Sequence, residues 1–154
     1  MRCTDTKVVG VEALIRCENQ AHGMVPPDEF IPLAEELGLI SNIGTWVIEE
    51  AVRQLAEWQS IDLCDMRVYI NIAAPQFQLE HFVSEVLNTL NRHNAPTTML
   101  ELEVTESVIM DNVDAMVIQL SILREAEVRI AIDDFGTGYS SLSYLQDSLF
   151  RIKK

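Results

Sequence analysis

The sequence predicts an α/β fold in which mostly parallel strands alternate with helices. Apolar runs near residues 8–15, 66–73, 99–105 and 128–133 have the length and composition of buried strands. Segments with helical spacing separate these runs, and such alternation favours a parallel sheet with right-handed crossovers. No repeat, low-complexity tract or linker interrupts the 154 residues, so we expect a single domain.

The helices are expected at residues 27–37, 41–58, 76–93 and 115–125. Pro27 suits a first helical turn, and Gly38 follows the last apolar position of that segment. Trp46 and Trp58 belong to one apolar stripe of the second segment, which predicts that both lie in the core. Residues 18–27 are polar and resemble a loop, and one more strand begins near residue 149.

Composition restricts the classes of function. The formal net charge of −13 argues against binding a nucleic-acid polymer, which needs clustered Lys and Arg. An anionic substrate would need metal ions or local arginines to offset this charge. No apolar run reaches the length of a membrane span, and Cys3, Cys17 and Cys64 lack the spacing of metal ligands. We therefore expect reduced thiols and a cytoplasmic location, either alone or within a larger signalling protein.

The most informative stretch is residues 130–141, where an apolar run ends in Asp133 and Asp134. Gly136 and Gly138 follow, and glycine tolerates the backbone angles of tight turns. Ligands bind at the carboxyl ends of the strands in parallel sheets and barrels. Two adjacent carboxylates at that position favour a divalent cation, although they are also compatible with a turn and a helix cap.

Polar residues also occur near the ends of three other predicted strands. Glu12 lies within an apolar run, where a carboxylate needs a partner, and an ion pair with Arg16 is the alternative to a site. Asn71 is either a neutral oxygen ligand or a hydrogen-bonding side chain. Glu103 alternates with apolar residues, so it faces either solvent or the interior of a barrel.

The spacing of these residues favours a common site. Asn71, Glu103 and Asp133 are separated by about 30 residues each, the length of one strand–helix unit, which places them at similar heights on successive strands. Oxygen ligands of this kind suit Mg²⁺ or Mn²⁺. Adjacent aspartates suit a pair of metal ions, as in two-metal phosphodiester hydrolysis.

Several ordered blocks resemble the EAL domain family of bacterial cyclic di-GMP phosphodiesterases. They are EAL-IR at 12–16, VPPDEFIPLAE at 25–35, NIAA at 71–74, LEVTES at 102–107 and DDFGTGYSSL at 133–142. A three-residue match would carry little weight, whereas five blocks in order cover nearly the whole chain. Residues 1–154 are therefore identified as a partial EAL domain.

This resemblance implies an incomplete TIM-type (β/α) barrel and hydrolysis of cyclic di-GMP to linear pGpG with Mg²⁺ or Mn²⁺, two ions being expected. It implies that Glu12, which is also catalytic, Asn71, Glu103, Asp133 and Asp134 are metal ligands. It also implies that Arg16 contacts a substrate phosphate. Glu106 would brace the loop at 134–141, which in the family couples dimer contact to metal binding.

The chain also departs from the family pattern. A complete barrel needs about 250 residues, so we expect the first strand and the last strands and helices to be missing. Lys154 stands where the family has its catalytic lysine, but Arg151, Ile152 and Lys153 precede it without the usual Pro and Asp. Because an open barrel leaves sheet edges uncovered, we expect a homodimer or a partner domain.

Three functions are consistent with these observations. The first is a metal-dependent cyclic di-GMP phosphodiesterase in truncated form. The second is a catalytically inactive EAL module that binds cyclic di-GMP or a protein partner. The third, a hydrolase of another phosphoester, is disfavoured by the DDFGTGYSSL block.

Overall fold

The computed structural model describes residues 8–21, 23–61, 65–105, 113–133 and 151–152. Its main sheet contains five strands in the order β1-β4-β5-β6-β7, and every neighbouring pair is parallel. The strands are β1 (Gly10–Ala13), β4 (Arg67–Asn71), β5 (Leu100–Thr105), β6 (Arg129–Asp133) and β7 (Arg151–Ile152). This arrangement confirms the predicted α/β class, and within the described residues the sheet stays open between β1 and β7.

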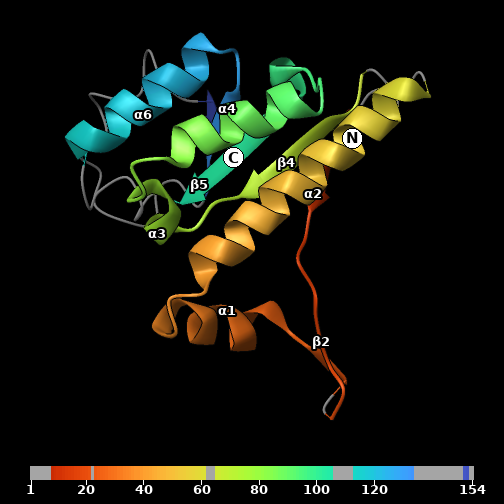
Figure 1. Ribbon diagram of the computed structural model, residues 1–154, viewed down its shortest axis with the longest axis vertical. Helices are drawn as coiled ribbons and strands as arrows, with labels where there is room; N and C mark the ends of the chain where they lie inside the picture. The colour runs from red at the N-terminus through yellow and green to blue at the C-terminus, as the bar shows by residue number, and fades with distance from the viewer. Residues whose placement is uncertain (1–7, 22, 62–64, 106–112, 134–150, 153–154) are drawn as a thin grey trace.

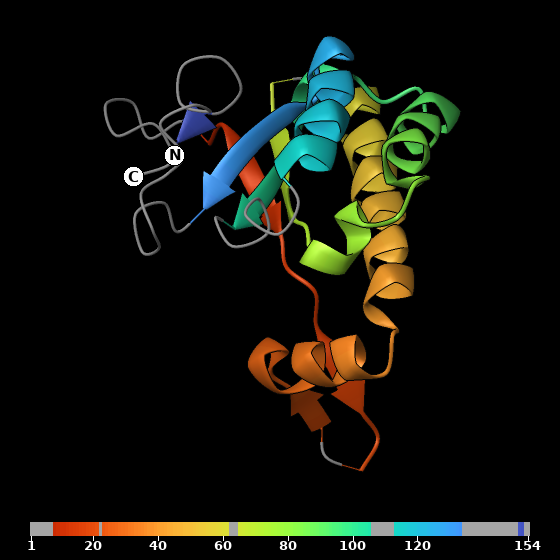
Figure 2. The ribbon, with the colours of Figure 1, turned by 90° about the vertical axis from the view of Figure 1, so that its left-hand side faces the viewer.

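Three helices cover one face of this sheet. They are α2 (Ile40–Ser60), α4 (Phe82–Arg92) and α6 (Val113–Glu125). Figures 1 and 2 show them side by side on the same side of the strands. Their buried apolar side chains pack against Ile70, Leu102 and Ile132 of the sheet, which are at most 2% exposed. The hydrophobic core therefore lies between the helices and this face.

The opposite face of the sheet carries polar side chains. Because successive strand residues point to opposite faces, Glu101 and Glu103 lie on the other side of β5 from Leu100, Leu102 and Val104. Glu101 and Glu103 are nevertheless only 3% and 4% exposed. The alternation in β5 therefore separates an apolar helix-covered face from a polar inner face, as expected for part of a barrel.

A small lobe projects from the end of β1, below the sheet in Figure 2. It consists of an antiparallel hairpin, β2 (Cys17–Asn19) and β3 (Gly23–Val25), followed by α1 (Pro27–Glu36). The prediction of a loop at residues 18–27 was therefore wrong. The Asn19 side chain accepts a hydrogen bond from the Ala21 amide, and Gly23 adopts a φ of 73°. These two features close the hairpin within a sequence too polar to be read as strand.

The single helix predicted at residues 76–93 is interrupted. A short helix, α3 (Ala74–Phe77), comes first, and α4 begins only at Phe82. Turn-type hydrogen bonds from Leu79 N–H to Gln76 O and from Phe82 N–H to Leu79 O join the two. The apolar spacing alone did not reveal this break, because Phe77 and Phe82 are both buried and were both read as apolar positions of one helix. A 3₁₀ turn, η1 (Thr97–Met99), then leads into β5.

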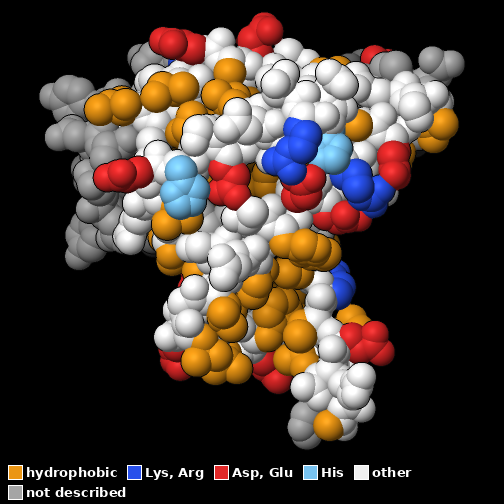
Figure 3. Space-filling model, in the orientation of Figure 1, with side chains coloured by type: hydrophobic (Ala, Val, Ile, Leu, Met, Phe, Trp, Pro, Cys, Tyr) orange, Lys and Arg blue, Asp and Glu red, His pale blue; other side chains and the backbone are white. Residues whose placement is uncertain are grey.

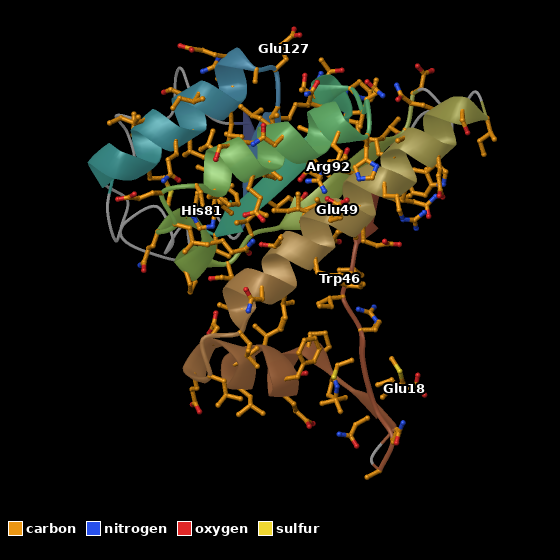
Figure 4. The ribbon with its side chains drawn as sticks, viewed as in Figure 1. Glu18, Trp46, Glu49, His81, Arg92 and Glu127 are labelled. Carbon is orange, nitrogen blue, oxygen red and sulfur yellow. The ribbon has the colours of Figure 1, made fainter. Side chains whose placement is uncertain are left out.

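The prediction for the two tryptophans was half right. Trp58 is partly buried against the core, whereas Trp46 is 59% exposed. Trp46 projects from α2 in Figure 4 and lines an apolar groove of about 230 Å³ beside the edge strand β1. The apolar stripe of α2 covers both the face that packs against the core and the flank that lines this groove. The spacing of apolar residues therefore does not show which of the two tryptophans is buried.

Polar contacts join α2 and α4 on the outer surface, where acidic, basic and histidine side chains lie close together in Figure 3. Glu49 of α2 pairs with Arg92 at 3.1 Å and with the Nε2 atom of His93 at 2.7 Å (Figure 4). Further along α2, Arg53 hydrogen-bonds to Glu50, which lowers the pKa of that carboxyl group. In the described part of the chain, no helix combines the length and apolar character that crossing a membrane requires.

Candidate functional site

A hydrogen bond between neighbouring strands defines one side of the candidate site. The Asn71 Nδ2 atom, at the end of β4, donates to the Glu12 Oε1 atom on β1 over 2.7 Å. Glu12 lies opposite Tyr69 in the sheet register, so Asn71 is one pleat further along the same face. Among the described residues, Glu12 forms no ion pair with Arg16, which was the alternative to a site; the Arg16 Nη1 atom instead donates to the Ile15 carbonyl at 2.8 Å.

Glu103 occupies the next strand at the same height. It lies directly opposite Asn71 in the register of β4 and β5. The Ile72 N–H also donates to the Glu103 carbonyl oxygen at 2.9 Å, which extends the ladder past the end of β4. Glu103 is 4% exposed, whereas Glu12 and Asn71 are exposed. The three side chains thus form a row with one buried and two accessible members.

The remaining predicted residues are only partly covered by the structure. Asp133 ends β6 and lies opposite Thr105 in the register. Its side chain, together with Asp134, Glu106 and Lys154, lies outside the described residues. The predicted roles of these four residues therefore stay predictions.

Arg16 reaches the same region from the start of the lobe. It lines a cavity of about 290 Å³ together with Asn71, and the other walls come mainly from the apolar side chains of α1 and α2. Arg16 is exposed, and it forms no ion pair with any acidic residue in the described part of the chain. A cationic group beside an apolar cavity is suited to a ligand that carries both a negative charge and an apolar ring system.

The available donors are suited to a hard cation. Glu12, Asn71 and Glu103 offer only carboxylate and amide oxygens, which Mg²⁺ and Mn²⁺ prefer. Among the residues that the structure describes, no three carboxylate, imidazole or thiol groups gather closely enough to hold an ion. The described row supplies two carboxylates and one amide, so a complete ligand set would need further donors.

Two residues of this region were not assigned a role from the sequence. Gln76 of α3 is 4% exposed and lines the cavity beside Asn71. Its position three residues after Ala73, the residue that precedes the first turn of α3, is the signal that a capping side chain gives. Glu101 lies one pleat below Glu103 and is 3% exposed, and none of the described residues forms a hydrogen bond with its Oε2 atom. The alternation of residues in the strand predicts that Glu101 lies on the inner face, but it does not predict a role for its carboxylate.

Comparison with known proteins identifies the family. The family model described as "EAL domain" matches residues 1–152 of the chain. The chain belongs to the EAL domain family. A signaling protein of Bacillus subtilis, YkoW, is 49% identical to it over 141 residues, which are 92% of this chain and 18% of YkoW. A cyclic di-GMP phosphodiesterase of Pseudomonas aeruginosa is 39% identical over 146 residues, which are 95% of this chain and 24% of that protein.

Solved EAL domains share the architecture. The structure of the MucR phosphodiesterase in complex with cyclic di-GMP superimposes with a TM-score of 0.84 at 47% identity. The match covers 89% of this chain and 56% of the MucR chain. This EAL domain chain therefore spans little more than half of that solved relative. The open five-stranded sheet is consistent with part of the family's TIM-like barrel.

Proposed function

We propose that this chain carries the metal-binding face of a phosphodiesterase that hydrolyses cyclic di-GMP to linear pGpG. The observation that carries the proposal is the row of Glu12, Asn71 and Glu103 across three neighbouring strands, joined by the 2.7 Å Asn71–Glu12 hydrogen bond. The named activity of the Pseudomonas aeruginosa relative and the ligand in the MucR structure support the choice of substrate.

Each described residue has a distinct task in this proposal. Glu12, Asn71 and Glu103, with Asp133 and Asp134, would hold Mg²⁺ or Mn²⁺, two ions being proposed. Such ions, when bound, lower the pKa of a coordinated water and offset negative charge on a phosphate. Arg16 binds a substrate phosphate at the cavity rim. We further propose that Lys154 is a catalytic residue and that Glu106 braces the loop at residues 134–141.

The Asn71 amide has one atom for each task in this proposal. In the structure its nitrogen donates to Glu12, so its oxygen is the atom that would be offered to a cation. The hydrogen bond from Asn71 would also orient the Glu12 carboxylate. The residues around Asn71 therefore need to fix its backbone so that both atoms keep their place.

The net charge gives a second reason for metal dependence. The chain carries a formal charge of −13, which repels an anionic dinucleotide. Arg16 alone cannot offset both the substrate phosphates and the site carboxylates. Divalent cations held by the site carboxylates would offset this repulsion locally. We accordingly expect binding as well as turnover of cyclic di-GMP to depend on the cation.

The test is turnover of cyclic di-GMP by the purified chain with Mn²⁺, with product identified by chromatography. Glu12→Gln keeps the size of the side chain and removes its charge, and we expect it to lower the rate by about 100-fold. Glu18→Gln is the matched control, since Glu18 is an exposed glutamate of β2 outside the row. Equal rates for Glu12→Gln and wild type would contradict the proposal. A panel of other phosphoesters tests substrate choice.

A binding module without catalysis is the second candidate. It is supported by the cavity that Arg16 and Asn71 line, which could hold the ligand whether or not it is hydrolysed. Binding of cyclic di-GMP by a folded chain without turnover would establish this alternative.

We also propose that the chain acts in the cytoplasm and that a second copy or a partner domain covers the open edge of β1. A stable monomer by light scattering would contradict the homodimer.

A further inference from the structure

The turn that follows Asn71 is held at both of its backbone amides. The Ile72 N–H donates to the Glu103 carbonyl on β5 at 2.9 Å. The next amide, Ala73 N–H, donates to the Gln76 Oε1 atom at 3.1 Å. The Gln76 N–H in turn donates to the Ala73 carbonyl at 3.0 Å. The chain leaving Asn71 is therefore fixed to β5 on one side and to the Gln76 side chain on the other.

Gln76 is itself fixed from α2. Its carboxamide lies against Gly44, and a Cβ atom added at residue 44 would overlap the Gln76 Nε2 atom. A glycine in a helix interior costs about 1 kcal/mol relative to alanine. The absence of a side chain at Gly44 therefore creates the space that the carboxamide occupies. Helix α2, the Gln76 side chain and the end of β4 form one continuous set of contacts.

The polar character of Gln76 has a purpose that packing alone does not explain. Gln76 is only 4% exposed, and burying an amide is unfavourable unless it forms hydrogen bonds. A methionine would fill a similar volume at this position without that cost. What methionine lacks is an acceptor for the Ala73 N–H. Without it, that backbone donor would be left without a partner in a partly buried turn.

We propose that Gln76 is a positioning residue that sets the place of Asn71 in the site by fixing the turn that follows it. The proposal rests on the proposed function, because the predicted consequence is a site with lower metal affinity. Gln76 touches neither the reacting atoms nor the cation. It acts through the Ala73 amide, and Gly44 keeps its carboxamide in the required orientation. Outer residues of this kind alter metal affinity or activity by about 10- to 100-fold.

The first measurement does not depend on a metal. In nitrogen-edited NMR spectra of the whole chain, the Asn71 side-chain amide reports its hydrogen bond to Glu12. We expect Gln76→Met to move this resonance toward the position of a solvent-exposed amide. Gln76→Glu keeps an acceptor oxygen, and we expect it to restore the resonance. Thr89→Val is the control, because Thr89 is another buried polar residue, 3% exposed, on α4.

The second measurement is Mn²⁺ binding, followed by the electron paramagnetic resonance signal of the free ion. We expect Gln76→Met to raise the Mn²⁺ dissociation constant by about ten-fold or more, while Thr89→Val leaves it unchanged. Thermal unfolding of both variants separates this effect from a general loss of stability. A variant with Gly44→Ala, which displaces the carboxamide without changing its chemistry, should move the Asn71 resonance in the same direction as Gln76→Met.

The two measurements test the positioning role of Gln76 and the proposed function separately. An unchanged Asn71 resonance in Gln76→Met overturns the positioning role, whether or not the chain binds Mn²⁺. An equal shift in Thr89→Val overturns it as well, because the effect would then reflect destabilisation in general. A wild-type chain that binds no Mn²⁺ contradicts the proposed function, and the Asn71 resonance still decides the role of Gln76.

Discussion

The amide of Asn71 reaches across from β4 to hydrogen-bond Glu12 on β1, although 59 positions separate the two residues in the chain. The contact exists because the parallel pairing of β1 and β4 aligns Glu12 with Tyr69, one pleat below Asn71. It brings a carboxylate and an amide to the carboxyl ends of adjacent strands. Ligand sites form at this end of parallel sheets.

Divalent cations should stabilise the chain through these residues. A ligand that binds only the folded state at 100 times its dissociation constant raises the free energy of unfolding by about 2.7 kcal/mol. We expect saturating Mn²⁺ to raise the thermal midpoint of wild type and EDTA to reverse the rise. Glu12→Gln should abolish it, and Glu18→Gln should not. The same rise in Glu12→Gln as in wild type would place the cation elsewhere.

Alanine at position 44 should destabilise the protein despite its better helix propensity. The added methyl group would overlap the end of the Gln76 side chain, which would have to move and give up its hydrogen bond from the Ala73 amide. A partly buried backbone donor left without a partner costs about 1–3 kcal/mol. Urea unfolding measures the loss. The double variant with Gln76→Ala removes the clash, so the two effects should not add. Simple additivity would show that the two residues do not interact.

Replacing Glu101 with an apolar residue should stabilise the chain. Its side chain is 3% exposed, and its Oε2 atom has no partner within the structure described. A buried polar group without a hydrogen bond costs about 1–3 kcal/mol. Glu101→Leu should recover a similar amount in chemical unfolding. Glu125→Gln, at an exposed position of α6, serves as the control. A loss of stability in Glu101→Leu would mean that the carboxylate has a favourable role on the inner face.

The contacts between Glu49 and the end of α4 should contribute modestly. Arg92 and Glu49 are 61% and 36% exposed, and exposed pairs of this kind contribute about 0.2–1 kcal/mol. Glu49→Gln should therefore lower the free energy of unfolding by less than about 1 kcal/mol, with a smaller effect at high salt. A double-mutant cycle with Arg92→Met isolates the pair. A loss that salt leaves unchanged would assign the effect to the His93 hydrogen bond instead.

Protonation of Glu50 should weaken the surface of α2 at low pH. Hydrogen bonding from Arg53 lowers the pKa of Glu50 below its ordinary value of about 4.5. A lowered pKa in the folded state contributes stability above the ordinary pKa, and this contribution is lost as the pH falls through the lowered value. Arg53→Met should make the thermal midpoint fall less steeply below about pH 4.5. An identical acid profile would show that the pair does not contribute.

The parallel order of strands could be predicted because each strand is a short apolar run with its own helix. The inward-facing glutamates of β5 could be predicted because Leu100, Leu102 and Val104 alternate with them. The β2–β3 hairpin could not, since its strands are short, polar and closed by Asn19 and Gly23. Local polarity at that segment is indistinguishable from that of a loop.

The site was predicted less completely than the fold. The positions of Asn71 and Glu103 follow from spacing, and their register pairing confirms that they lie side by side. The bond from Asn71 to Glu12 depends on which rotamer each side chain adopts, which spacing does not determine. The role of Gln76 depends on contact with Gly44, 32 positions earlier, through a gap that only the folded helix α2 creates.

The contrast between the two faces of β5 favours its native register against β4 during folding. A shift of one residue against β4 would turn Glu101 and Glu103 into the helix-packed layer and place Leu100 and Leu102 on the polar inner face. The misaligned chain would then bury two carboxylates that no described side chain of that layer could neutralise. Competing pairings are therefore penalised heavily, and the same glutamates that make the inner face acidic also select the correct strand alignment.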